Sequence, residues 1–132
     1  MNKEELVKKA IEGRERSYSP YSKFKVGAAI LMKDGNYVLG ANIENAAYGD
    51  CICAERCSLF SAHMKGYDLK KDVVAMAIVG DTEKPISPCG SCRQVMNELL
   101  DKNTPVILSN LKYDIKEETV GNLLPYGFDD LD

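Results

Sequence analysis

Two short cysteine-containing segments constrain the fold of this chain more than any other feature. Residues 53–55 read Cys-Ala-Glu, and residues 88–92 read Pro-Cys-Gly-Ser-Cys. A structural zinc site usually has four protein ligands, whereas three ligands leave one position for water and a substrate. Glu55 stands where such a water needs an acid/base. If the three thiols bind one ion, two segments far apart in the chain must meet. The pattern predicts a catalytic site with three metal ligands: Cys53, Cys89 and Cys92.

The remaining cysteines keep other interpretations open. Five cysteines is an odd number, which disfavours a disulfide framework. Cys51 could supply a fourth thiolate and close the site as structural zinc, although Glu55 would then have no purpose. An isolated Cys89-x-x-Cys92 could instead be a thiol redox pair. Cys57 is expected to be a small buried hydrophobic residue.

Length, composition and charge limit the class of protein. A chain of 132 residues with 45% hydrophobic and 28% charged residues is typical of one globular domain, residues 1–132. The net charge of -3, with scattered basic residues, argues against a nucleic-acid partner. No apolar run approaches the ~18 residues of a membrane span, and residues 1–5 are typical of a charged helix start rather than an export signal. We therefore expect a cytoplasmic protein with no membrane partner.

The hydrophobic pattern predicts an α/β fold with a mixed sheet. Helices are expected over about residues 3–16, 53–65 and 90–100. Strands are expected over about residues 24–32, 37–43, 73–79 and 106–109, with the Asp-Gly pair at 34–35 forming a hairpin turn.

This pattern places the metal ligands at helix starts. Cys53 and Cys89 each begin a predicted helix, and Cys92 lies on the same helical face as Cys89. The partial positive charge of a helix N-terminus favours thiolate over thiol. We expect the two helix starts to converge on the ion.

The two motifs together match the pattern of zinc deaminases. In that pattern a His or Cys zinc ligand is followed two residues later by a Glu, and a P-C-x-x-C motif comes further along the chain. A wider resemblance is carried by five blocks of sequence, two of which contain these motifs. The blocks are 24–29 (FKVGAA), 42–48 (NIENAAY), 53–56 (CAER), 88–94 (PCGSCRQ) and 123–125 (LLP) with Phe128. Over nearly its whole length the chain resembles the small, homotetrameric, all-cysteine cytidine deaminases. The resemblance implies a three-layer α/β/α fold with about five strands in a mixed central sheet.

The resemblance also implies the reaction: hydrolytic, zinc-dependent deamination of cytidine and deoxycytidine to uridine and deoxyuridine plus ammonia, in pyrimidine salvage. One Zn2+ per subunit is implied. Glu55 would be catalytic, and Arg56 would donate hydrogen bonds to the ligand sulfurs. Phe24 would pack on the base, and Ala54 would bind the base through its backbone N–H.

The resemblance assigns the sugar to Asn42 and Glu44, which alternate with Ile43 at a predicted strand end and so point to one face. A carboxylate there would repel phosphate, which favours a free nucleoside over a nucleotide. In the homotetrameric family, residues corresponding to Tyr48 and Phe128 reach the active site from a neighbouring subunit. Alternatives remain open: a deaminase of a nucleoside antibiotic such as blasticidin S, or a non-catalytic zinc-binding module.

Overall fold

The computed structural model describes residues 1–131, and its framework is a mixed five-stranded sheet with the strand order β2-β1-β3-β4-β5. Only β3 and β4 pair in parallel, and the other three pairs are antiparallel. The strands are β1 (Val26–Met32), β2 (Tyr37–Ala41), β3 (Val73–Gly80), β4 (Pro105–Asn110) and β5 (Ile115–Thr119). The predicted mixed sheet is confirmed.

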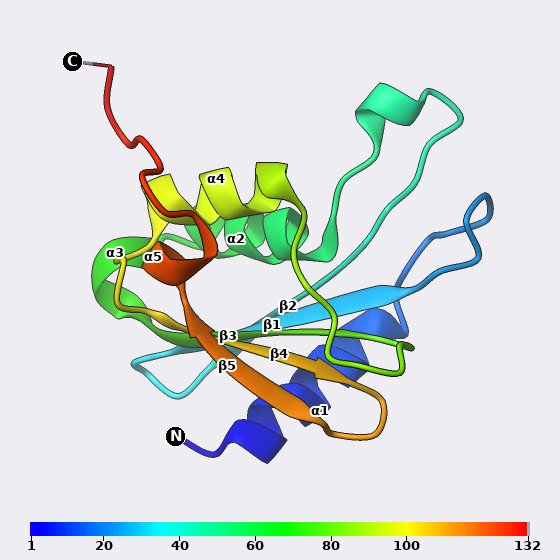
Figure 1. Cartoon of the computed structure of the whole chain (residues 1–132), viewed down its shortest axis with the longest axis horizontal. Helices are drawn as coiled ribbons and strands as arrows, with labels where there is room; N and C mark the ends of the chain where they lie inside the picture. Colours follow the sequence, from blue (N-terminus) through cyan, green and yellow to red (C-terminus); the bar gives the residue numbers. More distant parts are fainter. Residues whose placement is uncertain (132) are drawn as a thin grey trace.

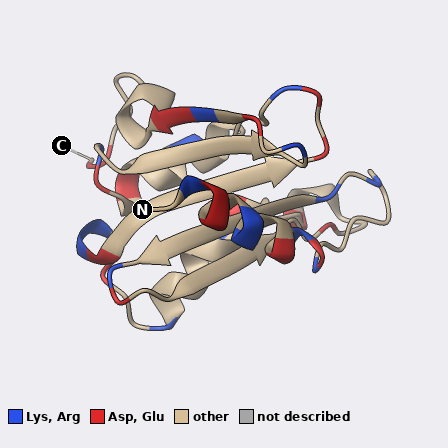
Figure 2. Ribbon diagram, turned by 90° about the horizontal axis from the view of Figure 1, so that it is seen from below, with Lys and Arg blue, Asp and Glu red and all other residues tan. Residues whose placement is uncertain are grey.

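Helices cover both faces of the sheet, so the predicted three-layer α/β/α fold is confirmed (Figure 1). The lower face in Figure 1 is covered by α1 (Lys3–Arg14), which buries Leu6, Val7, Ala10 and Gly13 and carries the charged positions coloured in Figure 2. The opposite face is covered by α2 (Ala54–Met64), α3 (Leu69–Asp72), α4 (Gly90–Leu99) and α5 (Val120–Leu123). A short 3-10 helix, η1 (Tyr48–Asp50), lies in the connection from β2 to α2.

The alternation of side chains along the strands explains the two layers of core. Successive residues of a strand point to opposite faces. In β1, Ile30 and Met32 pack toward α2 and α4, whereas Ala29 packs toward α1. In β3, Met76 likewise packs toward α2 and α4, and Ala75 packs toward α1. The α1 side of these strands therefore presents smaller residues to the helix.

The observed elements differ from the predicted ones at positions that matter for the site. Two predicted strands are longer than the observed ones, because Phe24 precedes β1 and Asn42 follows β2. Beyond the end of β2, Ile43 forms only isolated β-bridges, one with Tyr18 and one with Ile52. The sequence pattern also does not locate β5, since its residues are mostly exposed and charged and carry no core signal. In the described part of the chain, no helix has the length and apolar character needed to cross a membrane.

Candidate metal centre and active site

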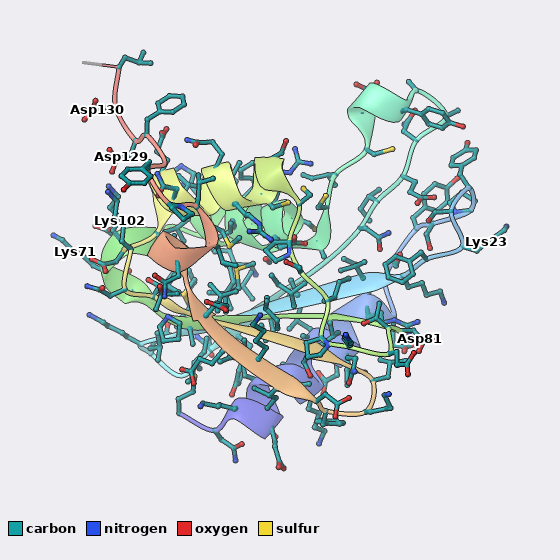
Figure 3. All side chains as sticks on the ribbon, viewed as in Figure 1. Lys23, Lys71, Asp81, Lys102, Asp129 and Asp130 are labelled. Atoms are coloured by element: carbon teal, nitrogen blue, oxygen red, sulfur yellow. The ribbon has the colours of Figure 1, made fainter. Side chains whose placement is uncertain are left out.

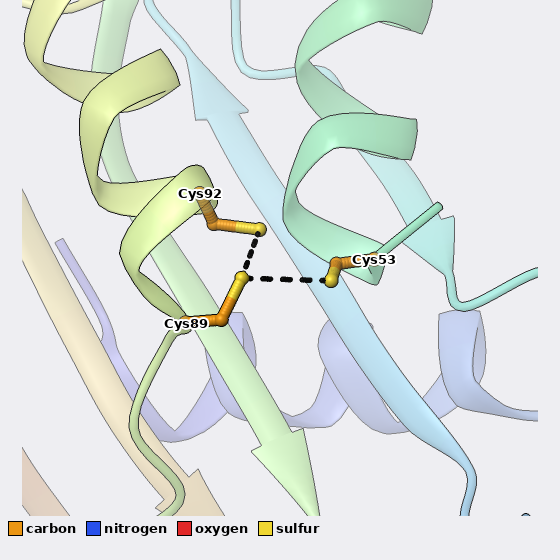
Figure 4. A group of neighbouring side chains, drawn as sticks. All are labelled: Cys53, Cys89 and Cys92. Carbon is orange, nitrogen blue, oxygen red and sulfur yellow. Dashed lines mark hydrogen bonds between the residues drawn. The ribbon is translucent and has the colours of Figure 1, made fainter. Parts of the chain in front are cut away.

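Three cysteine side chains meet where α2 and α4 begin, as predicted. Cys53 is the N-cap residue of α2, Cys89 is the N-cap residue of α4, and Cys92 lies in the first turn of α4. The Cys53 and Cys89 sulfurs are 3.7 Å apart, the Cys89 and Cys92 sulfurs are 3.4 Å apart, and all three lie within 4.8 Å of one another (Figure 4). Thiolates bound tetrahedrally to zinc at about 2.3 Å are about 3.8 Å apart. The spacing therefore fits one zinc ion.

A glycine in β2 lets α2 approach the sheet closely. A Cβ atom on Gly40 would lie 2.5 Å from the Ala54 carbonyl oxygen and 2.6 Å from the Ser58 backbone nitrogen. Only a residue without a side chain fits under this first turn of α2. Gly40 therefore helps to set the height of Cys53 above the sheet.

The thiols differ in their ease of ionisation. Hydrogen bonding with Cys92, and then with Arg56, lowers the pKa of the Cys53 thiol to about 5, against the opposing effect of its partial burial. The same contact with Cys53, together with burial, raises the pKa of Cys92. Neighbouring thiols cannot all ionise without a cation to balance their charge. The donor set thus suits a divalent cation such as zinc.

Glu55 lies beside the thiols in the first turn of α2, and only 3% of its surface is exposed. Burial raises the pKa of this carboxyl, and the nearby Cys53 raises it further. A carboxyl whose pKa moves toward neutrality can both accept and donate a proton. The structure therefore places a carboxyl suited to proton transfer next to the three thiols.

Arg56 contacts the sulfur of Cys53. Its Nη2 atom is 3.6 Å from the Cys53 sulfur, to which it donates a hydrogen bond, and this contact raises the pKa of the guanidinium. Its Nε atom is buried and has no hydrogen-bond partner within residues 1–131. The predicted contact between Arg56 and a ligand sulfur is present.

A cavity of about 190 Å³ opens onto the thiols. Two of the predicted substrate-binding residues, Asn42 and Ala54, lie in its wall. The sequence did not identify the walls supplied by Ile86 and Ser87, and the only signal for them was the proline-flanked loop that ends at Pro88. The full lining is Val26, Asn42, Cys53, Ala54, Glu55, Ile78, Ile86, Ser87 and Cys89.

Phe24 lies close to this cavity without lining it. A Cβ atom on Gly80 would lie 3.1 Å from the tip of the Phe24 ring and 2.7 Å from the Ile86 side chain. Gly80 therefore leaves room for the ring beside the cavity wall. The Phe24 side chain is partly exposed at the cavity rim.

The side chain of Asn42 is held by the segment that leads into β1. Its Oδ1 atom accepts hydrogen bonds from Ser17 Oγ at 2.5 Å and from the Val26 backbone N–H at 2.9 Å. Its Nδ2 atom donates to the Phe24 carbonyl at 2.8 Å. These contacts fix the orientation of the amide in the cavity wall.

Glu44 contacts the same connecting segment. Its carboxylate accepts hydrogen bonds from the backbone N–H groups of Tyr21 at 3.0 Å and Ser22 at 3.1 Å, and from Ser22 Oγ. The hydroxyl of Ser22 is the main cause of the lowered pKa of Glu44. Asn42 and Glu44 therefore both face the loop before β1, although they follow β2 rather than belong to it.

The two aromatic residues predicted to act across subunits lie outside the cavity of their own chain. Tyr48 is in η1, on a loop that projects from the sheet, and 79% of its surface is exposed (Figure 1). Phe128 follows α5 and is 63% exposed. Neither residue lines the cavity.

The two other cysteines do not join the cluster. Cys51 accepts a hydrogen bond from the Asn45 backbone N–H at 3.3 Å and is not among the clustered thiols of the described chain. This arrangement does not support a closed site of four thiolates. Cys57 is partly buried and lines a surface hollow together with Ile43, so it is less buried than the sequence predicts.

Three thiols at two converging helix starts, with a buried carboxyl beside them on an α/β/α sheet, define a zinc enzyme that uses water in a hydrolytic reaction. A family model described as the cytidine and deoxycytidylate deaminase zinc-binding region matches residues 1–108. The chain belongs to this family.

Similar proteins share nearly the full length of the chain. A cytidine deaminase from Halalkalibacterium halodurans is 56% identical over 128 residues, which cover 97% of this chain and 95% of that protein. A cytidine deaminase from Sporosarcina psychrophila is 49% identical over 97% of this chain and 92% of that protein. The crystal structure of a cytidine deaminase from Burkholderia pseudomallei superposes with a TM-score of 0.93 at 48% identity, covering 97% of this chain and 100% of that one.

Proposed function

We propose that this protein is a zinc-dependent cytidine deaminase that hydrolyses cytidine and deoxycytidine to uridine and deoxyuridine plus ammonia. The observation that carries the proposal is the buried Glu55 carboxyl beside three clustered thiols, with Glu55, Cys53 and Cys89 in the wall of one cavity. Relatives that carry this name and span nearly the whole chain support the same reaction.

The proposed mechanism assigns the metal to Cys53, Cys89 and Cys92 and the proton transfers to Glu55. When bound, a zinc ion supplies the Lewis acidity that makes water nucleophilic at neutral pH. Glu55 accepts a proton from the attacking water and delivers it to N3 of the cytosine ring as the C4–O bond forms. Glu55 then moves a proton from the new C4 hydroxyl to the amino group. Ammonia leaves as the C4–N bond breaks and the C4 carbonyl forms.

The proposed substrate pose places the base in the cavity and the sugar at its rim. A cavity of about 190 Å³ is smaller than the pockets of about 300–1,000 Å³ that enclose drug-sized ligands, so it suits a single ring. Ala54 offers its backbone N–H to the base and Phe24 packs on the ring. Asn42 and Glu44 bind the ribose hydroxyls, and the charge of Glu44 disfavours a 5′-phosphate.

We also propose a homotetramer of single-domain subunits, residues 1–132, in which Tyr48 and Phe128 complete neighbouring active sites. Asp132 lies outside the described residues. The support is the family resemblance together with the exposure of both aromatic side chains outside their own cavity. Reduced thiols at the site require a reducing compartment, which supports a cytoplasmic location.

A substrate panel with zinc measured on the same sample tests this function. Purified protein is expected to contain about one zinc per chain and to remove the long-wavelength absorbance of cytidine and deoxycytidine. CMP and cytosine are expected to react much more slowly. Equal activity on CMP would overturn the role of Glu44, and activity on blasticidin S alone would replace the nucleoside proposal with the antibiotic one.

The Glu55→Gln variant tests the mechanism separately from the metal site. Because the amide cannot transfer protons, we expect kcat to fall by at least about 100-fold. Zinc content is expected to stay at the level of the unmodified protein, because Glu55 is not a ligand. A variant that keeps full turnover contradicts the proposed mechanism.

A further inference from the structure

Arg93 follows the C-x-x-C motif directly, but its side chain neither joins the thiol cluster nor lines the cavity. Its guanidinium makes three hydrogen bonds. Nε donates to the Pro88 carbonyl at 2.9 Å, Nη2 donates to Ser87 Oγ at 2.7 Å, and Nη1 donates to the Leu123 carbonyl at 2.9 Å. One side chain on α4 thus connects the turn that precedes Cys89 with the end of α5.

The residues after α5 also lie against α4. We call residues 123–128 the C-terminal strap. The Phe128 carbonyl accepts hydrogen bonds from Gln94 Nε2 at 2.7 Å and from the buried Asn97 Nδ2 at 3.2 Å. A Cβ atom on Gly127 would lie 2.6 Å from the Leu124 side chain and 3.0 Å from that of Asn97. The strap therefore fits α4 closely, with a glycine at the tightest contact.

Just beyond the strap, a surface ion pair adds a further contact. Asp129 lies 3.8 Å from the ammonium group of Lys102, and Figure 3 shows the two side chains on neighbouring segments. An exposed pair of this kind contributes little to stability. The strap is held on the helix mainly by the hydrogen bonds to its carbonyls and by the buried side chain of Leu123.

We propose that Arg93 is a positioning residue that couples the C-terminal strap to the metal site. A guanidinium holds its donors in a rigid fork, so three fixed acceptors on two segments keep their relative positions. The turn at Ser87–Pro88 carries Cys89, and groups that orient metal ligands from outside typically change metal affinity or activity by about 10- to 100-fold when removed. The inference rests on the thiol site of the proposed function but not on any feature of the substrate.

The first test measures zinc release to a chelator in Arg93→Ala, Arg93→Lys and a control, Arg16→Ala, which removes an exposed arginine. We expect about 10- to 100-fold faster release in Arg93→Ala. Arg93→Lys is expected to recover little, because one ammonium group cannot reach all three acceptors. Cobalt-substituted protein is expected to show a changed visible spectrum in both Arg93 variants, since that spectrum reports the geometry of the thiolate ligands. Arg16→Ala is expected to match the unmodified protein.

The second test loosens the strap at contacts other than those of Arg93. Gly127→Val adds a side chain where the strap folds onto its own Leu124 and meets Asn97 of α4, and it is expected to speed zinc release as well. Because Arg93→Ala breaks the same connection, adding Gly127→Val to it is expected to cause little further change. Gln94→Ala, which removes one contact to Phe128, is expected to have a smaller effect in the same direction.

The outcomes separate this inference from the proposed function. If the unmodified protein binds no zinc, both are wrong. If it binds zinc but Arg93→Ala releases it at the control rate, only the role of Arg93 is wrong. If Arg93→Ala is too unstable to purify, Gly127→Val and Gln94→Ala decide: release at the control rate in both overturns the coupling, and faster release supports it.

Discussion

Single residues around Cys53 decide how negative charge is distributed in the site. Three thiolates on one divalent cation carry a net negative charge, which weakens the cation as a Lewis acid. The guanidinium of Arg56 withdraws part of that charge through its hydrogen bond to Cys53. The pKa of the Cys53 thiol is lowered first by its hydrogen bond with Cys92 and then by the hydrogen bond and charge of Arg56.

Replacing Arg56 with Gln should therefore reduce activity through the metal ligand. We expect kcat/KM for cytidine to fall by about 10- to 100-fold, because a neutral amide balances less thiolate charge. Steady-state kinetics on samples with matched zinc content measure the effect. Lys65→Gln removes an exposed positive charge at the end of the same helix and serves as the control. Equal losses in both variants contradict a specific role for Arg56.

A second residue-scale prediction concerns Glu44 and its hydrogen bonds from Ser22. The pKa of Glu44 in the folded protein lies below its ordinary value of 4.5, mainly because of the Ser22 hydroxyl. The stability that these contacts contribute is present above pH 4.5 and is lost as the pH falls through the lowered pKa. In Ser22→Ala the pKa is expected to rise toward 4.5, as followed by NMR of the carboxyl carbon. An unchanged pKa contradicts the assigned cause.

At the scale of elements, two helices that begin side by side build the metal site. Their N-termini converge because α2 and α4 pack on the same face of the sheet. The height of α2 depends on Gly40, where any side chain would collide with backbone atoms of the first turn. The position of the ligands is thus a property of helix packing as well as of the cysteines.

Gly40→Ala is expected to destabilise the protein by about 1–3 kcal/mol, because the added methyl group overpacks the contact between β2 and α2. Urea denaturation measures the free energy of unfolding. Zinc affinity is expected to fall in parallel, since α2 carries Cys53. The control is Gly49→Ala, where a Cβ meets no atom within 4 Å. A stable Gly40→Ala protein would show that α2 can move without cost.

At the scale of the whole molecule, several aromatic side chains are exposed near the chain end and on the projecting loop. Tyr48, Tyr126 and Phe128 are each more than half exposed. Exposed aromatic residues are common in interfaces between subunits, where they bury a large area. The arrangement is consistent with active sites that neighbouring subunits complete.

Complementation between two inactive variants tests this arrangement. Phe128→Ala and Glu55→Ala are each expected to have low activity alone. In the proposed homotetramer, mixed assemblies formed by dissociation and reassembly would contain sites with an intact Glu55 from one chain and an intact Phe128 from another. Random mixing at equal amounts is expected to restore about a quarter of the sites. If mixing restores no activity, Phe128 does not act across subunits.

Much of the site could be predicted because metal chemistry leaves a local signature. Cys53, Cys89 and Cys92 follow from residue type, spacing and the expected helix starts, and the structure brings them together. Glu55 follows from its place beside Cys53. Strand ends were less predictable: apolar residues such as Ile43 continue the strand pattern after the hydrogen-bonded ladder has ended.

Residue type and local spacing were sufficient to predict the thiol cluster, the place of the proposed acid/base beside it and the α/β class, because each depends on short-range chemistry and periodicity. Tertiary structure decided which distant groups meet. It excluded Cys51 from the thiol cluster, turned Glu44 toward Ser22, and placed Arg93 between Pro88 and Leu123. These contacts depend on how whole elements pack, and packing is a long-range property that no local pattern encodes.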